Sequence, residues 1–238
     1  MPMQPRKVGF IVFVLLFFFQ SPAANSFALG VDFIERAHFK EDQSGQFSIE
    51  VNLKKINKLI WFIKYLNKDY KHQGITKSIG YKAFSNAKVC LEQIPDISHV
   101  CVNYNEKMLS FELSFAFNTI DALNKAMRKI NRGLDPAQIT YFSLDDGLFV
   151  RQDVNGIAKK VLFYQRYDNC LIKSLDLASF FKDTTYTTIH TFDKEIERRP
   201  SNPQSELTKD KKTVRIIHSV FAPDQVEESI YNCVHFVK

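Results

Sequence analysis

Hydrophobic and polar residues alternate in several short runs after residue 30, as they do in β-strands that bury one face. Three pairs of these runs flank a turn sequence and predict β-hairpins: 31–39 with 46–53, 100–104 with 109–117, and the two halves of 139–152. Two further strands are expected near 184–192 and 212–220, on either side of the polar loop 194–211. The tail 230–238 is predicted to form a last edge strand.

The alternation also predicts which side chains of the hairpins face the core. In the first hairpin these are Val31, Phe33, Ala37, Phe39, Phe47, Ile49, Val51 and Leu53. In the second hairpin the pattern continues through Phe111, Phe115 and Phe117. These three rings either form plain core or line a pocket for an apolar ligand, so a carrier function is one alternative.

Apolar residues return at helical spacing in four other segments. They predict helices at 54–68, at 82–93, between Asn118 and Gly133, and at 171–181. Hairpins separated by helices indicate the α+β class, with a mainly antiparallel sheet built from hairpins and three or four packed helices. Because no break in composition demands a second domain, we expect residues 29–238 to form a single domain.

The first 28 residues have the layout of a secretory signal peptide. Arg6 and Lys7 precede an apolar run from Val8 to Phe19, and small residues follow up to Ala28. This run is shorter than the roughly 20 residues that a membrane-spanning helix needs. We therefore expect cleavage after Ala28 and a secreted product in the periplasm or cell envelope. The alternative is a chain that stays anchored to the membrane by an uncleaved N-terminal segment.

The composition is that of a globular chain, with 45% hydrophobic and 24% charged residues and a formal net charge of +6. The positive charge is concentrated in one segment, since nine lysines and a single acid, Asp69, occur from Lys54 to Lys88. In the predicted helix 54–68, Trp61 and Tyr65 fall among the lysines and not in the apolar stripe.

Exposed aromatic rings among lysines are typical of a surface that meets anionic lipid, because the rings enter the interface while the lysines meet negative groups. The residues predicted to make this contact are Lys54, Lys58, Trp61, Lys64, Tyr65 and Lys68. The expected partner is an anionic lipid surface or an acidic envelope protein, and the alternative is an ordinary solvated helix face. Nucleic acid would satisfy the same electrostatics, but we do not expect an exported chain to meet it.

Four cysteines follow the predicted leader, and an exported chain can oxidise them. The candidate disulfide residues are Cys90, Cys101, Cys170 and Cys233. Four cysteines allow three pairings, and the sequence does not choose among them or against buried free thiols. The chain contains no C-x-x-C motif, which disfavours zinc and thioredoxin-type sites.

Two histidines on neighbouring predicted strands offer the clearest route to an enzyme. His190 and His218 share strand parity with apolar residues and would approach each other if their strands pair, with His235 joining from the tail. An exported hydrolase or metal-dependent enzyme is therefore a second alternative. No ligand spacing or catalytic motif supports it, so we assign no catalytic, cofactor or metal-binding residue and expect no cofactor.

Five stretches of the chain resemble an uncharacterised family of exported, often lipid-anchored proteins from Bacteroidetes, which is distantly similar to LppM-type envelope domains. The stretches are FIERAHFKEDQSGQFSIEVNL at 33–53, LEQIPDIS at 91–98, FELSFAFNTIDALNKAMRKI at 111–130, TTYTTIHTF at 184–192 and DKKTVRI at 210–216. The resemblance implies an envelope location and an α+β fold, and it carries over no catalytic residue. The chain lacks the lipobox cysteine of that pattern. We therefore expect an exported envelope protein that acts as a non-catalytic interaction or structural module.

Overall fold

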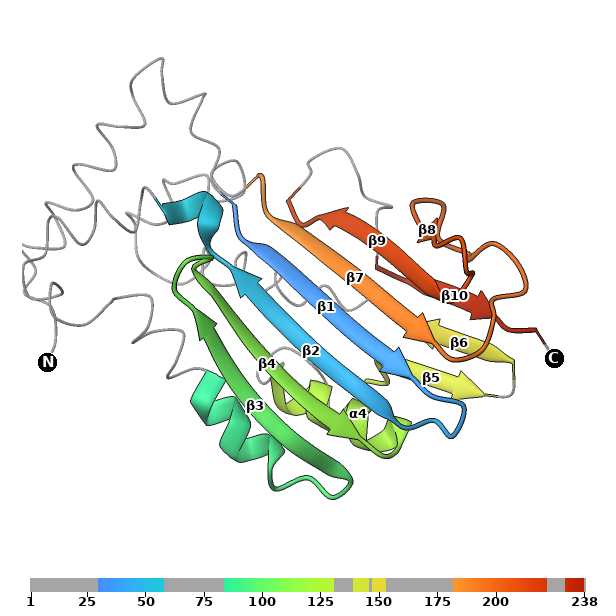
Figure 1. The fold of residues 1–238 in the computed structure, drawn as a ribbon, viewed down its shortest axis with the longest axis horizontal. Coiled ribbons are helices and arrows are strands. Elements are labelled where there is room, and N and C mark those ends of the chain that lie inside the picture. The colour runs from blue at the N-terminus through green and yellow to red at the C-terminus, as the bar shows by residue number, and fades with distance from the viewer. Residues whose placement is uncertain are drawn as a thin grey trace, which may run out of the picture.

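The computed structural model describes residues 30–57, 84–130, 139–145, 147–152, 182–221 and 230–237. Its main element is a seven-stranded sheet with the strand order β3-β4-β2-β1-β7-β9-β8 (Figure 1). The strands are β1 (Asp32–Phe39), β2 (Gly45–Asn52), β3 (Ile97–Asn105), β4 (Ser110–Phe117), β7 (Thr185–Phe192), β8 (Glu206–Leu207) and β9 (Thr213–Ser219). Neighbouring strands are antiparallel except at the centre, where β1 and β7 run parallel.

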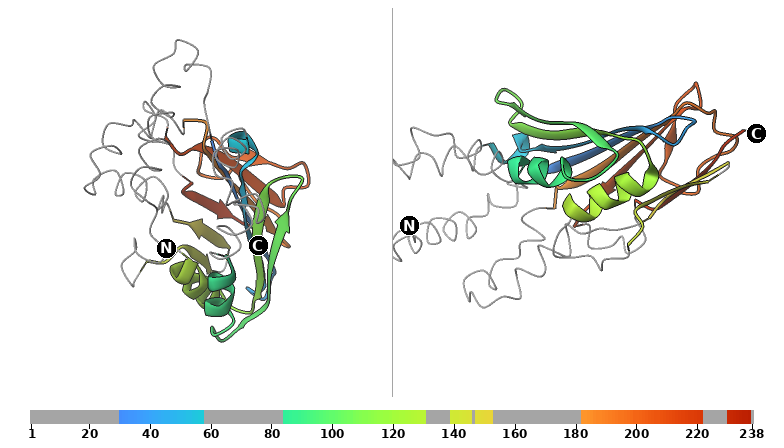
Figure 2. Two further views of the ribbon diagram at one scale, coloured as in Figure 1. Left: turned by 90° about the vertical axis from the view of Figure 1, so that its left-hand side faces the viewer. Right: turned by 90° about the horizontal axis from the view of Figure 1, so that it is seen from below.

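A second layer covers one face of this sheet, as the two turned views show (Figure 2). It contains a three-stranded antiparallel sheet with the order β10-β6-β5 and two α-helices. Its elements are β5 (Phe142–Asp145), β6 (Leu148–Arg151), β10 (Asn232–His235), α4 (Ile120–Ile130) and the helix at 84–91. We call the covered side of the seven-stranded sheet its inner face and the opposite side its outer face.

Phenylalanine rings from both layers fill the space between them. Phe39 and Phe192 on neighbouring strands stack with their ring centroids 5.5 Å apart, and Phe149 from β6 lies 4.9 Å from each. Phe47 contacts Phe142 from β5 at 6.2 Å. Because successive residues of a strand point to opposite faces, each alternating run supplies one row of this core.

The helix α4 is joined to the second sheet by a buried side chain, Asn124. Its amide oxygen accepts hydrogen bonds from the backbone N–H groups of Tyr141 (2.8 Å) and Phe142 (2.9 Å), and its Nδ2 donates to the Phe142 carbonyl at 2.8 Å. These bonds satisfy backbone groups at the start of β5, which would otherwise be buried without partners. The helix α4 begins directly after Thr119. The hydroxyl oxygen of Thr119 accepts a hydrogen bond from the backbone N–H of Ala122 at 3.1 Å and so caps the helix.

The three predicted hairpins are confirmed: β1–β2, β3–β4 and β5–β6 pair in antiparallel register. The strands expected near 184–192 and 212–220 form β7 and β9, and the tail contains β10. The predicted helices at 82–93 and after Asn118 correspond to the helix at 84–91 and to α4.

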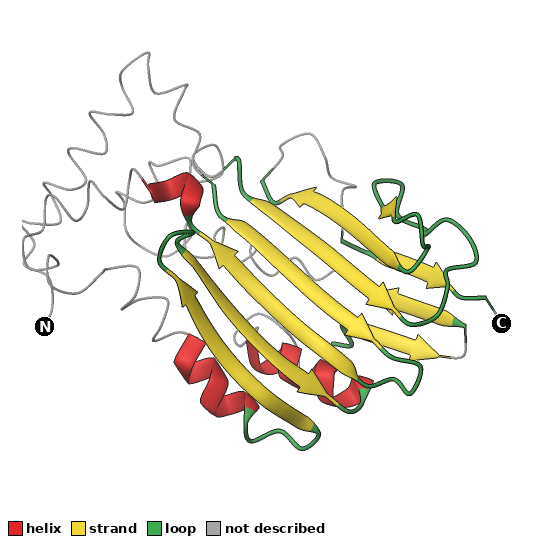
Figure 3. Ribbon diagram, in the orientation of Figure 1, coloured by secondary structure: helices red, strands yellow, loops and turns green. Residues whose placement is uncertain are grey.

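The prediction of an α+β fold with three or four packed helices is wrong. Most of the regular secondary structure in the described residues is strand, with ten strands and two α-helices (Figure 3). The predicted helix 54–68 begins as a single 3-10 turn, Lys54–Ile56, and most of it, like 171–181, lies outside the described residues. The physical reason is the second sheet, whose strands cover part of the inner face that we expected helices to cover.

Candidate functional site

The inner face carries one charged side chain in the middle of β1, Glu35, which is fully buried. Arg151 at the end of β6 donates two hydrogen bonds to it, from Nε to Oε1 at 2.9 Å and from Nη2 to Oε2 at 2.8 Å. His190 Nε2 lies 3.0 Å from Oε1, and the Tyr186 hydroxyl donates to Oε2 at 2.7 Å. These four residues, which we call the Glu35 network, join both central strands to the second sheet.

The network fixes the charges of its members. Burial alone would raise the pKa of Glu35, but the charge of Arg151 and the hydrogen bonds from His190 and Arg151 outweigh it and hold that pKa well below its usual range. Burial lowers the pKa of His190, so the imidazole stays neutral. Burial and the neighbouring Glu35 carboxylate raise the pKa of Tyr186.

Ring packing shields Glu35, Arg151 and His190 from solvent. The Arg151 guanidinium lies 4.7 Å from the centre of the Phe142 ring, and Phe149 contacts the His190 ring edge-on at 5.3 Å. Glu35, Arg151 and His190 are each at most 1% exposed, while Tyr186 at the end of the network is half-buried. A bidentate ion pair in this setting orients the two layers, and its carboxylate is fully buried.

The predicted approach of His190 and His218 is wrong. In the β7–β9 register His190 lies opposite Val214, whereas His218 lies opposite Tyr186. Four positions along a strand separate the two imidazoles by roughly 13 Å, since a strand rises about 3.3 Å per residue. His235 is in the other sheet, where its ring contacts Arg198 and lies 3.7 Å from Cys233 Sγ. The described residues contain no group of three side chains able to hold a metal ion.

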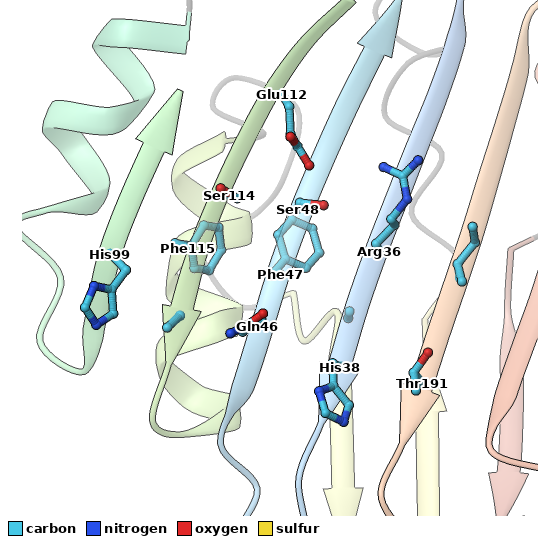
Figure 4. Close-up of a pocket in the computed structure, with 13 residues that line it drawn as sticks. Arg36, His38, Gln46, Phe47, Ser48, His99, Glu112, Ser114, Phe115 and Thr191 are labelled. Atoms are coloured by element: carbon cyan, nitrogen blue, oxygen red, sulfur yellow. The ribbon is translucent and has the colours of Figure 1, made fainter. Parts of the chain in front are cut away.

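A groove of about 470 Å³ crosses the outer face over β1, β2 and β4 (Figure 4). Its floor consists of short side chains: Ser48 and Ser114 are direct partners across β2 and β4, and Ala116 follows two residues later. Arg36 and His38 form one side, from β1, and His99 from β3 forms the other. Glu112 on β4 lies near the serines, and Thr191 on β7 adds a more distant edge. We call this feature the outer groove.

The basic side chains of β1 that line the outer groove already have acidic partners. Arg36 Nη2 forms an ion pair with Glu50 Oε2 at 3.1 Å, and His38 Nε2 lies 2.8 Å from Asp193 Oδ1. The carboxylate of Glu112, by contrast, makes no hydrogen bond or ion pair in the part of the chain that the structure describes. The groove therefore offers one uncompensated acceptor group above a floor of hydroxyls.

Most of the predicted lipid-contact surface lies outside the described residues: Lys58, Trp61, Lys64, Tyr65 and Lys68. Its first residue, Lys54, is exposed in the 3-10 turn that follows β2. The neighbouring Lys55 donates from Nζ to Asp32 Oδ1 at 2.6 Å and to the Asp183 carbonyl at 2.9 Å. The start of the basic segment is thereby attached to the end of the sheet where β1 begins.

The described cysteines Cys90, Cys101 and Cys233 are free thiols in this structure, and Cys170 lies outside the described residues. Cys101 points to the outer face, where its Sγ contacts Asn103 Oδ1 at 3.5 Å. For Cys170 the two alternatives that the sequence left open, a disulfide and a free thiol, are not tested by the described residues. Phe111, Phe115 and Phe117, the candidate lining of an apolar pocket, are all buried in the core.

Sequence reasoning missed both Glu35 and the outer groove. The signal for Glu35 was present, because it occupies the same strand parity as Phe33, Ala37 and Phe39, where only a partnered carboxylate is tolerated. The groove had a weaker signal: serine and alanine recur at the polar positions of β2 and β4, but only the strand register places them side by side.

Comparison with protein-family models finds no match, and no curated protein sequence is significantly similar to this chain. Among solved structures, the folded domain of LppM from Mycobacterium tuberculosis aligns over 89% of this chain and 92% of its own length, with a TM-score of 0.39 and 6% identity. That similarity is weak. Within the described residues no helix has the length and apolar character needed to cross a membrane.

Proposed function

We propose that this chain is an exported, non-catalytic interaction module of the cell envelope that contacts an anionic membrane surface through its basic segment 54–88. The N-terminal sequence supports export, since a short apolar run behind Arg6 and Lys7 ends in small residues at Ala28. The nine lysines of the segment, with Trp61 and Tyr65 among them, supply the chemistry of an anionic lipid contact.

The observation that carries the proposal is the attachment of Lys55 to Asp32 and to the carbonyl of Asp183. Gly30 and Asp32 are the first described residues after the predicted leader, so the basic segment leaves the sheet at the same end at which the chain enters it. Gly30 itself packs closely on that carbonyl, because a Cβ at this position would overlap the Asp183 oxygen. Gly30, the first described residue, and Lys54, the first residue of the basic segment, therefore lie at the same end of the sheet.

Vesicle co-sedimentation of residues 29–238 tests this function. We expect binding to vesicles of phosphatidylglycerol and phosphatidylcholine and none to phosphatidylcholine alone, with loss of binding at high salt. The double variant Trp61→Ala with Lys58→Glu should bind at least about tenfold more weakly, because each lysine near an anionic surface contributes about 1 kcal/mol.

Lys209→Glu is the matched charge control. Lys209 is exposed in the loop before β9, at the opposite end of the sheet from Lys55. Its reversal changes the net charge by the same amount as Lys58→Glu and should leave binding nearly unchanged. Equal losses in both variants, or no binding to anionic vesicles at low salt, would refute the membrane contact.

Export is tested separately by fractionation of cells that produce the full chain with a C-terminal epitope. We expect a processed product shortened at Ala28 in the periplasmic or envelope fraction. A full-length product in the cytosol would contradict the export part of the proposal, whatever the vesicle result.

A further inference from the structure

We propose that the outer groove binds a saccharide, with Glu112, Ser48 and Ser114 as its hydrogen-bonding groups. The inference goes beyond the membrane contact proposed above and does not depend on it. The groove lies on the face of the sheet opposite the core, and its described lining comes from β1, β2, β3, β4 and β7 (Figure 4). Its volume of about 470 Å³ lies within the range of roughly 300–1,000 Å³ that is usual for small-molecule sites.

The floor of the groove is polar and has free hydrogen-bonding capacity. The hydroxyls of Ser48 and Ser114 make no hydrogen bond within the described residues, and the two lie directly opposite each other on β2 and β4. Gln46, the next outward residue of β2, adds an exposed amide that both donates and accepts. A ligand covering this floor must exchange hydrogen bonds with it at several points, as a polyhydroxylated ring does.

The charges of the groove narrow the class of ligand. An anionic ligand is disfavoured because Arg36 and His38 are engaged with Glu50 and Asp193, while the free charge is the carboxylate of Glu112. A carboxylate accepts hydrogen bonds from hydroxyl donors, and such charge-assisted bonds are stronger than neutral ones. An apolar ligand is disfavoured by the hydroxyl floor. A ligand rich in hydroxyl donors satisfies both conditions.

A bulge in the edge strand β3 shapes the side of the groove opposite β1. The β3–β4 register shifts between Ser98 and Cys101, and His99 within this bulge has a φ of 53°, in the left-handed region. A bulge re-aims the side chain that it carries, and here the exposed His99 ring borders the groove. The imidazole can donate or accept a hydrogen bond at the outer rim of a bound sugar.

Titration of residues 29–238 with neutral trisaccharides, followed by isothermal calorimetry and by shifts of backbone amide signals, tests the proposal. The probes are cellotriose, mannotriose and tri-N-acetylchitotriose, with trilysine and inorganic phosphate as competing chemistries. We expect at least one trisaccharide to bind at millimolar concentration or below and to shift amides of β2 and β4. Glu112→Gln should weaken that binding about tenfold or more, because it removes a charged acceptor and keeps the shape.

Ser114→Tyr fills the groove and should abolish trisaccharide binding, while Ile217→Tyr is the matched control. Ile217 is an exposed residue of the outer face on β9 and does not line the groove. Circular dichroism confirms that both variants fold. The proposal is overturned if no trisaccharide binds, if Ser114→Tyr binds as the parent does, or if trilysine binds instead and is released by salt. None of these outcomes affects the vesicle assay, so the two proposals fail independently.

Discussion

Glu35 on β1 and Glu112 on β4 are carboxylates of the same sheet, but they lie on opposite faces. Glu35 is fully buried and has hydrogen bonds from Arg151, His190 and Tyr186. Glu112 is partly exposed, borders the outer groove and has no partner among the described residues. A charge that is buried in the folded chain needs a charged or hydrogen-bonding partner. The hydrogen-bonding capacity of Glu35 is therefore already used within the fold. An unpaired charge at the surface remains available to a ligand.

The largest difference in the free energy of unfolding is expected between variants of two neighbouring residues of β2 that point to different faces of the sheet. Phe47→Ala removes a ring that packs on Phe115 at 5.2 Å and on Phe142, and it should lower the free energy of unfolding by about 3–5 kcal/mol. Ser48→Ala, on the outer face, should change it by less than about 0.5 kcal/mol. Urea denaturation of both variants measures the contrast, and equal losses would contradict the assignment of the faces.

Glu35→Gln should come next, with a loss of about 3 kcal/mol, because the amide keeps an acceptor but leaves the Arg151 guanidinium buried without its counter-charge. The double variant Glu35→Leu with Arg151→Met removes both charges and should recover most of the loss in the same urea experiment. A single variant as stable as the parent would mean that the Glu35 network does not support the junction of the two layers.

Two buried members of the Glu35 network, His190 and Glu35 itself, also make the stability of the protein depend on pH. The pKa of buried His190 is lowered, so the unfolded chain binds more protons below about pH 6.5 and stability falls as the solution is acidified. The depressed pKa of Glu35 adds a loss in the same direction below about pH 4.3. The contribution of His190 is at most about 1.4 kcal/mol per pH unit.

His190→Gln isolates that contribution. Denaturation midpoints at about pH 7 and about pH 5 should differ less in this variant than in the parent, because the variant cannot take up the proton on unfolding. Ile217→Gln, at an exposed position of β9 that carries no titratable group, is the control variant and should keep the slope of the parent. An unchanged slope in His190→Gln would show that another group carries the acid sensitivity.

The smallest effect on stability is expected for Glu112→Gln, below about 0.5 kcal/mol, because its carboxylate has no partner to lose. The same variant is predicted to weaken trisaccharide binding. Glu112→Gln should therefore lower the affinity for the trisaccharide while leaving the free energy of unfolding nearly unchanged. A large loss of stability in urea would instead place Glu112 among the structural charges, with Glu35.

The sequence predicted the hairpins correctly because each is specified locally, by period-2 alternation on both sides of a turn such as Asp145-Asp146-Gly147. It did not predict the parallel pairing of β1 with β7, in which Asp32 pairs with Thr185 and Phe39 with Phe192. The paired residues are 153 positions apart in the sequence, and no local pattern encodes such a pairing. The Glu35 network depends on this pairing, which brings His190 and Tyr186 to β1. The outer groove depends in the same way on the register between β2 and β4, which places Ser48 opposite Ser114.

The parallel junction of β1 and β7 also has a consequence for how the chain reaches its folded state. The strands β1 to β4 are close in sequence and can assemble early, but one edge of β1 stays open until residues 185–192 have joined it. An open, alternating edge strand is a template for pairing with a second molecule. We therefore expect the period before β7 docks to be the time at which nascent or refolding copies are most prone to aggregate, and most dependent on a chaperone.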